Sequence, residues 1–148
     1  MKFITAFILF LLSISALAMD VTTIPTTDAE WNEFLDILSE VESNSTDGIV
    51  KTDVNGRKSY GRLQIQSGYL RDSGLSYTLE QVRTSKEISY KVAKAYLEKY
   101  ARIYESLPEN AGKRATVEVL ARIHNGGPNG WRRSSTIAYL GKVKTKFG

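Results

Sequence analysis

The chain contains no cysteine, and this restricts how it can fold more than any other feature of the sequence. A small domain without disulfides must be stabilised by its apolar core alone. The same absence excludes thiol nucleophiles and cysteine-based metal sites, and the single histidine supplies too few ligands for a zinc site. We therefore expect neither a metal nor a cofactor.

The N-terminus has the pattern of a secretory signal. A basic residue precedes an apolar run from Phe3 to Leu12, and small residues then form a cleavage motif. We expect residues 1–18 to be the signal, residues 19–26 a short leader and residues 27–148 one domain. An uncleaved anchor is the alternative, but the apolar run is shorter than the ~20 residues that span a bilayer. The mature protein is thus expected to be secreted, with no membrane span.

The charge of the chain is moderately basic. The formal net charge is +4, and removal of Lys2 with the signal would leave +3. This basicity suits contact with anionic polymers, although solubility explains it equally well. Lysines and arginines do not cluster with aromatic residues as they do on nucleic-acid-binding surfaces, so nucleic acid is excluded as a partner.

A first helix is predicted from residue 27 onward. Thr27 and Glu30 have the spacing of a capping box, in which each side chain accepts a hydrogen bond from the other residue's backbone. Apolar residues follow at helical spacing: Trp31, Phe34, Leu35, Leu38 and Val41. Glu42 lies four residues after Leu38 and seven after Leu35, so we expect its carboxyl on the buried side of the helix end.

The segment after this helix is polar and rich in turns. Asp47-Gly48 and Asn55-Gly56 are typical of hairpin turns, so short strands are expected at residues 49–53 and 58–64. A second capping box, Thr78 with Gln81, predicts a brief helix. No repeat or low-complexity segment interrupts the chain.

Three more helices are predicted in the C-terminal half. Ser85 can cap a long helix whose apolar stripe is formed by Ile88, Val92, Tyr96, Tyr100 and Ile103. The next helix contains Val117, Leu120 and Ala121 and should stop at Gly126-Gly127-Pro128. The last helix is expected at residues 135–144 and carries the apolar residues Ile137 and Leu140.

Three features occur in a fixed order: Glu42 at a helix end, Tyr60-Gly61-Arg62-Leu63-Gln64-Ile65, and His124-Asn125-Gly126-Gly127-Pro128. Together they resemble the lysozyme-like superfamily over most of the chain after residue 30. Invertebrate-type lysozymes and small transglycosylase-like domains are nearest in pattern. The resemblance implies a mainly α (α+β) lysozyme-like fold with a small β-hairpin after the first helix. The lack of cysteine departs from invertebrate-type lysozymes, which are rich in disulfides.

Glu42 is the first candidate catalytic residue. Cleavage of a glycosidic bond needs a carboxylic acid that is still protonated near neutral pH. Burial against Leu35 and Leu38 would raise the pKa of Glu42, and the negative end of the helix dipole would raise it further. The alternative is a solvated glutamate at a frayed helix end, beside Glu40.

Asp53 is the candidate second carboxylate. The resemblance implies it, because invertebrate-type lysozymes carry a catalytic aspartate at the matching place. A retaining pair of carboxyls stands about 5–5.5 Å apart and an inverting pair about 6.5–9.5 Å apart. The alternative is that Asp53 caps its own turn. Asp47 is a weaker rival, and Arg57 excludes a calcium-binding EF-hand loop because an oxygen ligand is needed at that position.

The resemblance also implies residues that bind sugar. Gln64 would hydrogen-bond an N-acetyl group and Tyr60 would stack on a sugar ring, unless the segment is only an amphipathic edge strand. His124 should point inward, either as a satisfied core residue or to orient Asp53 or contact sugar. Asn125 could close its helix or bind an acetamido group. Tyr139 matches an aromatic residue near the cleft of relatives, but core packing explains it equally well.

The activity implied is that of a secreted, bacteriolytic lysozyme. Such an enzyme hydrolyses β-1,4 bonds between N-acetylmuramic acid and N-acetylglucosamine in peptidoglycan or a related N-acetylated polysaccharide, and we expect it to act as a monomer. A lytic transglycosylase, which forms 1,6-anhydromuramyl products, is the main alternative. A non-catalytic protein that binds peptidoglycan or chitin is a third.

Overall fold

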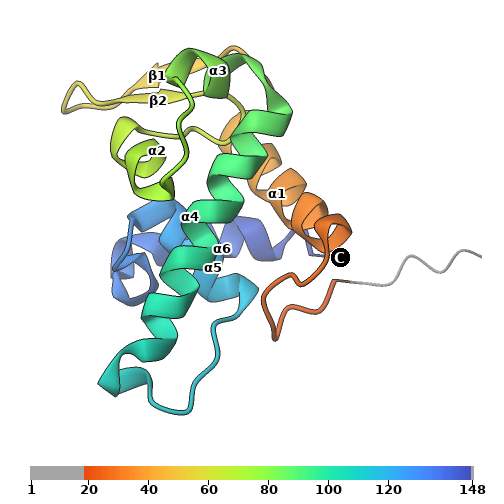
Figure 1. The fold of residues 1–148 in the computed structure, drawn as a ribbon, viewed down its shortest axis with the longest axis vertical. Helices are drawn as coiled ribbons and strands as arrows, with labels where there is room; N and C mark the ends of the chain where they lie inside the picture. The colour runs from red at the N-terminus through yellow and green to blue at the C-terminus, as the bar shows by residue number, and fades with distance from the viewer. Residues whose placement is uncertain (1–18, 148) are drawn as a thin grey trace, which may run out of the picture.

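The computed structural model describes residues 19–147, so the expected secretory signal at residues 1–18 lies outside the described residues. This part of the chain is mostly helical, with one two-stranded antiparallel sheet (Figure 1). The elements in order are α1 (Asp28–Ser43), β1 (Val50–Thr52), β2 (Lys58–Tyr60), α2 (Ser67–Ser73), α3 (Leu79–Thr84), α4 (Lys86–Ser106), η1 (Pro108–Asn110), α5 (Val117–Gly126), η2 (Gly130–Arg132), η3 (Ser134–Thr136) and α6 (Ile137–Lys144). The predicted mainly α fold class, with a hairpin after the first helix, is confirmed. Within residues 19–147, no helix is both long and apolar enough to cross a membrane.

The predicted helix starts are confirmed. The Thr27 hydroxyl accepts a hydrogen bond from the Glu30 backbone, and the Glu30 carboxylate accepts one from the Thr27 backbone. Thr78 and Gln81 form the same reciprocal pair at α3. Ser85 caps α4 by accepting from the backbone of Ile88. Each cap satisfies N–H groups that a helix start otherwise leaves unpaired.

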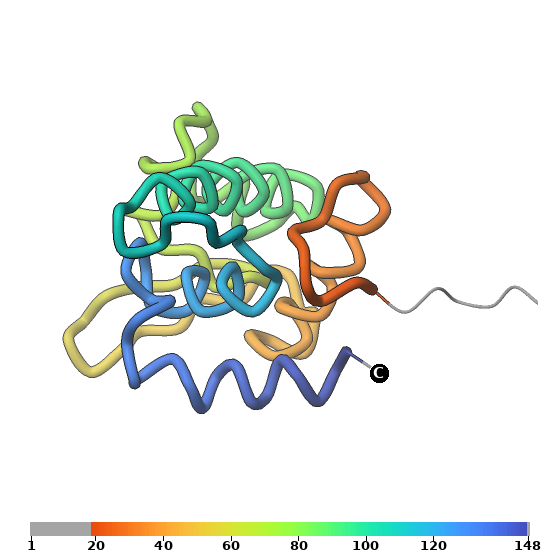
Figure 2. Tube along the Cα trace, turned by 90° about the horizontal axis from the view of Figure 1, so that it is seen from below, coloured from red at the N-terminus to blue at the C-terminus, as the bar shows by residue number. Residues whose placement is uncertain are grey.

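Helix α5 lies between α4 and α6, and α1 packs against both α4 and α6 (Figure 2). The fully buried side chains come from all of these elements and from the turn after β2: Phe34, Leu35, Leu38, Leu63, Ile65, Val92, Leu97, Val117, Leu120, Ile123 and Val143. This core holds the end of α1 and the end of α5 in fixed relative positions.

The predicted stripe of α4 is wrong at its C-terminal end. Ile103 is exposed, whereas Leu97, Ala101 and Tyr104 are buried. Successive residues lie about 100° apart around a helix, so Ile103 stands about 100° from Tyr104 and about 160° from Ala101 and faces away from the side that those two residues bury. In the last helix, Ile137 is exposed and Val143 occupies the core.

The second strand is shorter than predicted. It ends at Tyr60, and residues 61–64 form a tight turn instead of continuing the strand. Two backbone hydrogen bonds of 3.0 Å between Tyr60 and Ile65 close this turn. Gly61 has a positive φ of 73° and lies so near α3 that a Cβ at this position would stand 2.7 Å from the Val82 carbonyl oxygen. The glycine therefore bends the chain where an alternating pattern suggested a straight strand.

The glycines after α5 allow close packing as well as a turn. A Cβ on Gly126 would overlap the methyl group of Thr136, and a Cβ on Gly130 would overlap the Arg122 carbonyl oxygen. The turn lets Trp131 pack edge-on against Tyr104, with ring centroids 5.0 Å apart. This turn therefore folds the C-terminal segment back onto the body.

Candidate active site

Glu42 lies in the last turn of α1, beside a groove with a volume of about 840 Å³. The groove runs between the hairpin, helix α2 and the C-terminal end of α5. Its lining residues include Glu42, Lys51, Asp53, Arg57, Ser59, Gln64, Tyr69, His124, Asn125, Gly127, Pro128 and Arg133. Only 18% of the Glu42 side chain is exposed, so the expected placement on the buried side of the helix is observed.

Burial raises the pKa of Glu42 to about 7. Loss of hydration disfavours the charged carboxylate, and this effect outweighs the Tyr139 phenol and the positive charges of Lys51 and Lys142, which act in the opposite direction. The Lys51 ammonium donates to the Glu42 backbone carbonyl at 2.8 Å. Glu42 can therefore hold a proton at the edge of the groove near neutral pH.

His124 is neutral and has a fixed tautomer. Its Nε2 lies 3.1 Å from the Leu63 carbonyl oxygen, which can only accept, so Nε2 carries the hydrogen. Nδ1 must then accept from the Tyr69 hydroxyl, 2.9 Å away. Burial lowers the pKa of His124 to about 4. The 3.5 Å approach of Nε2 to the Glu42 carboxyl is therefore a contact with a neutral ring and not an ion pair.

Asp53 lies at the end of β1 and lines the same groove as Glu42. One of its oxygens accepts hydrogen bonds from the backbone of Asn55 and Arg57, and the other accepts from the Arg57 side chain at 3.0 Å. These bonds lower the pKa of Asp53. Asp53 thus caps its own turn and also presents an ionised carboxylate to the groove. His124 makes no hydrogen bond to it within the described residues.

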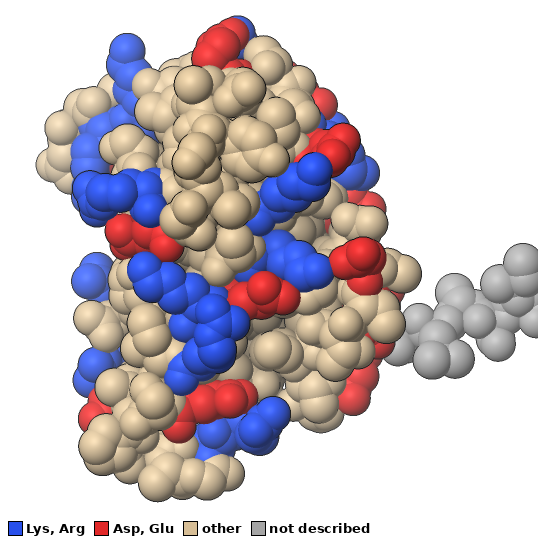
Figure 3. All heavy atoms as spheres, viewed as in Figure 1, with Lys and Arg blue, Asp and Glu red and all other residues tan. Residues whose placement is uncertain are grey.

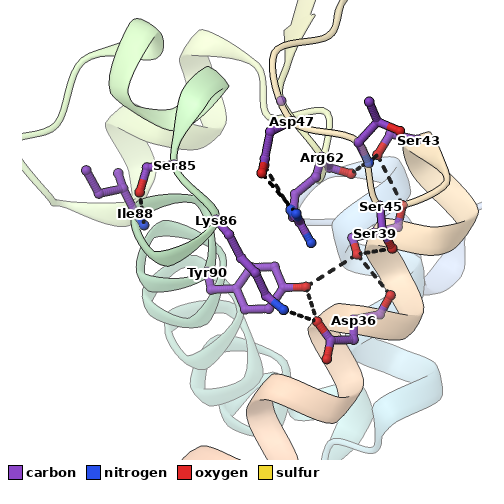
Figure 4. A network of polar contacts seen from close by, with 12 residues as sticks. Asp36, Ser39, Ser43, Ser45, Asp47, Arg62, Ser85, Lys86, Ile88 and Tyr90 are labelled. Carbon is purple, nitrogen blue, oxygen red and sulfur yellow. Dashed lines mark hydrogen bonds and ion pairs between the residues drawn. The ribbon is translucent and has the colours of Figure 1, made fainter.

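The rival aspartate, Asp47, lies outside the groove lining. Arg62 binds both of its carboxylate oxygens at 2.9 Å. This pair belongs to a polar network between α1, α4 and the turn after β2, in which Tyr90 donates to Asp36 (Figure 4). The Ser43 hydroxyl donates to the Arg62 carbonyl at 2.8 Å, which ties the end of α1 to this turn. The network therefore positions the helix end that carries Glu42.

Two of the expected sugar-binding residues line the groove with free polar atoms. Gln64 donates to the Gly61 carbonyl at 2.8 Å, and its amide oxygen has no hydrogen-bond donor in residues 19–147. Asn125 is exposed, and the Gly127 N–H closes the helix end by donating to Ile123. Asn125 is therefore not needed as the helix cap.

The two aromatic residues expected near the sugar, Tyr60 and Tyr139, lie outside the groove lining. Ser59 lines the groove, whereas its neighbour Tyr60 lies outside the groove lining. The position of Tyr60 therefore does not favour the expected stacking on a sugar ring. The Tyr139 hydroxyl is buried, lacks a hydrogen bond of normal geometry within the described chain, and has its pKa raised by burial and the nearby Glu42. Tyr139 thus forms part of the wall behind Glu42.

Three residues that line the groove were not predicted from the sequence: Tyr69, Lys51 and Arg133. Tyr69 lies on α2, which has no capping side chain and was not predicted. It stacks on Tyr96 with ring centroids 3.6 Å apart. Lys51 and Arg133 have no sequence motif, because their role depends on the folded positions of the hairpin and the C-terminal turns.

Comparisons with known proteins identify lysozymes as similar. The chain is 33% identical to invertebrate-type lysozyme 3 of Caenorhabditis elegans over 100 residues, which cover 63% of this chain and 70% of that protein. It is 32% identical to a lysozyme of Ostrea edulis over 95 residues, 63% of this chain and 64% of the relative. The chain thus spans less than two thirds of the oyster lysozymes that it matches. No family model matches the chain.

Solved structures show the same fold. The crystal structure of Tapes japonica lysozyme has a TM-score of 0.63 and 31% sequence identity, over 76% of this chain and 86% of that one. A structure of Aeromonas hydrophila PliI in complex with Meretrix lusoria lysozyme has a TM-score of 0.66 and 25% identity, over 83% and 91%. The predicted resemblance to lysozymes is confirmed.

Proposed function

Because this chain belongs to the invertebrate-type lysozyme family, we propose that it is a glycosidase that hydrolyses the β-1,4 bonds of peptidoglycan. The observation that supports this proposal is that two of the carboxyl groups that line the groove, those of Glu42 and Asp53, differ in protonation state. Burial keeps a proton on Glu42, whereas hydrogen bonds keep Asp53 ionised. Acid-catalysed cleavage of a glycoside uses such a pair.

In the proposed reaction, Glu42 donates its proton to the oxygen of the leaving sugar. The positive charge that develops on the other sugar is stabilised by Asp53, or Asp53 attacks the anomeric carbon directly. The neutral His124 lies beside Glu42 and supplies no positive charge that would lower the pKa of Glu42. Gln64 and Asn125 offer amide groups to the acetamido groups of the substrate.

The location and assembly of the protein belong to the same proposal. The N-terminal pattern supports secretion, and a bacteriolytic role follows if peptidoglycan outside the cell is the substrate. We also propose that residues 27–148 act as one domain and as a monomer. No further component is needed, since both catalytic groups lie on one chain.

Product analysis tests the reaction type. Purified peptidoglycan is digested with the protein, and the soluble fragments are analysed by mass spectrometry. Hydrolysis should give reducing muramyl ends, whose mass exceeds that of 1,6-anhydromuramyl ends by one water. Anhydro ends would instead indicate a lytic transglycosylase, and binding without any product would indicate a non-catalytic protein.

The pH profile of kcat/KM should be bell-shaped. Activity should fall as the pH rises through about 7, because Glu42 then loses the proton that it must donate. It should fall on the acid side only below the usual range for aspartate, because hydrogen bonds to Asn55 and Arg57 lower the pKa of Asp53. Initial rates on a soluble glycan measure the profile. A basic limb near the ordinary glutamate pKa of about 4.3 would contradict the assignment of Glu42.

A further inference from the structure

Three basic residues line the described groove, and two of them already have partners. The Lys51 ammonium donates to the Glu42 carbonyl, and the Arg57 guanidinium pairs with Asp53. Arg133 differs, because within residues 19–147 its exposed side chain forms neither an ion pair nor a hydrogen bond. Its charge is therefore available to a ligand in the groove.

The backbone of Arg133 is fixed although its guanidinium has no partner. The Arg133 carbonyl accepts hydrogen bonds from the Arg122 guanidinium and the Thr136 hydroxyl, both at 2.9 Å. The aliphatic part of the side chain passes over Gly126, with Cδ 3.8 Å from the position that a Cβ there would occupy. Arg133 is thus held beside Asn125, at the rim of the groove.

The acidic groups of the groove do not neutralise this charge. Glu42 holds its proton below about pH 7, and Asp53 is paired with Arg57. Asp72 accepts a hydrogen bond from Tyr100 at 3.0 Å. Elsewhere the charges are mixed, and Figure 3 shows basic and acidic side chains interspersed across one face of the molecule. An unpaired arginine in the groove is therefore a local feature that favours an anionic ligand.

We propose that Arg133 binds a carboxylate carried by the substrate and so favours muramyl glycans over neutral chitin. This inference rests on the proposed function. N-acetylmuramic acid carries a lactyl carboxylate when it is free of peptide, and peptide stems carry carboxylates of their own. Chitin carries none. A planar guanidinium can donate two parallel hydrogen bonds to a carboxylate, which gives direction as well as attraction.

The neighbouring Arg132 provides a matched control. Its guanidinium lies 4.8 Å from the centre of the Trp131 ring and pairs with Glu109 at 2.9 Å. It does not line the groove. The variants R133Q and R132Q thus remove the same charge from adjacent positions, one facing the groove and one facing away, and R133K keeps the charge at the first position.

Binding is measured by titration calorimetry with the full mature chain, in a Glu42→Gln background that prevents cleavage. Three ligands of equal glycan length separate the sources of the carboxylate: a peptide-free muramyl glycan, the same glycan with peptide stems, and chitohexaose. R133Q should weaken the binding of one or both carboxylate-bearing ligands by about three- to tenfold, as expected for a charge-assisted hydrogen bond at a partly exposed site. R133K should lose less affinity for these ligands than R133Q. Chitohexaose binding and the thermal midpoint of unfolding should not change in either variant.

Other results would overturn the inference. Equal weakening of all three ligands by R133Q would indicate a general loss of groove structure, and unchanged binding of both carboxylate-bearing ligands would show that Arg133 does not contact them. An equal effect of R132Q would assign the effect to net charge alone. If the unmutated protein released no product from peptidoglycan, the proposed function itself would fail, and that result does not depend on Arg133.

Discussion

The Glu42→Gln variant should lose cell-wall hydrolysis by about 10²- to 10⁴-fold, the usual contribution of a general acid. Glutamine has nearly the same shape as a protonated glutamic acid, but it has no proton to give to the leaving oxygen. The groove, the His124 contact and the turn at residues 61–64 should all remain. Release of soluble muropeptides from purified peptidoglycan measures the loss.

Stability measurements separate this catalytic loss from unfolding. The folded pKa of Glu42 is about 7, above the value of about 4.3 expected in the unfolded chain. The native state therefore binds the Glu42 proton more tightly, and this contribution to stability is complete below about pH 4 and is lost as the pH rises through 7. The buried His124 has the opposite pH dependence, because its folded pKa of about 4 lies below its ordinary value of 6.5. The Glu42 contribution is therefore the difference between the wild type and Glu42→Gln: relative to this variant, the wild type should lose about 2.5 kcal/mol between pH 5 and pH 8. Urea unfolding at pH 5 and pH 8 measures it.

Glu40 provides the matched control for this experiment. It lies two residues earlier on α1, is exposed, and pairs with Lys146 outside the groove. Glu40→Gln removes the same charge from the same helix, so hydrolysis should remain within about twofold of the wild type, as for other surface changes that cost little energy. If Glu40→Gln and Glu42→Gln lost activity equally, the loss would belong to the charge of α1, and the assignment of the acid would be wrong.

Local signals in the sequence were sufficient for much of the fold. Thr27, Thr78 and Ser85 cap their helices through bonds within four residues, so the sequence alone predicts these starts. The burial of Glu42 followed from its spacing to Leu35 and Leu38 on one helix. In each case the physical cause lies within a few turns of chain, where periodicity and capping rules apply.

The remaining features depend on contacts between distant segments. Helix α2 begins at Ser67, and the side chain of the preceding Gln66 makes no capping bond, so nothing local marks its start. Position 61 requires glycine because its φ is positive and α3 leaves no room for a Cβ, and no sequence pattern specifies that neighbour.

The candidate active site, too, was only partly predictable from the sequence. The tautomer of His124 is set by Leu63 and Tyr69, which lie 61 and 55 residues away in the sequence. A lone histidine on an apolar face is consistent with either a core residue or a cleft residue, and His124 is both buried and groove-lining. Residue type and spacing could therefore nominate the site but could not describe its electrostatics.

Asp53→Asn should lower hydrolysis by about 10²-fold or more, because the positive charge of the transition state loses a fixed negative partner. The asparagine oxygen can still accept from the backbone of Asn55 and Arg57, so the hairpin turn should persist. The exposed pair with Arg57 is lost, and because solvent screens such a pair the stability should change little. Muropeptide release and urea unfolding measure the two effects separately.

Asp47→Asn is the control for Asp53, since it removes a paired carboxylate that lies outside the groove lining. The asparagine oxygen can still accept from Arg62, so the network that positions the end of α1 should persist. The products should be unchanged, the rate should stay close to that of the wild type, and stability should fall slightly. The two aspartates together distinguish hydrolysis from transglycosylation. A transglycosylase closes an anhydro ring with the sugar's own hydroxyl and needs no second carboxylate, so Asp53→Asn would then retain most activity and give anhydro ends. A strong loss of activity in Asp53→Asn but not in Asp47→Asn, with reducing ends in the residual product, would show that hydrolysis uses the negative charge of Asp53 in the groove.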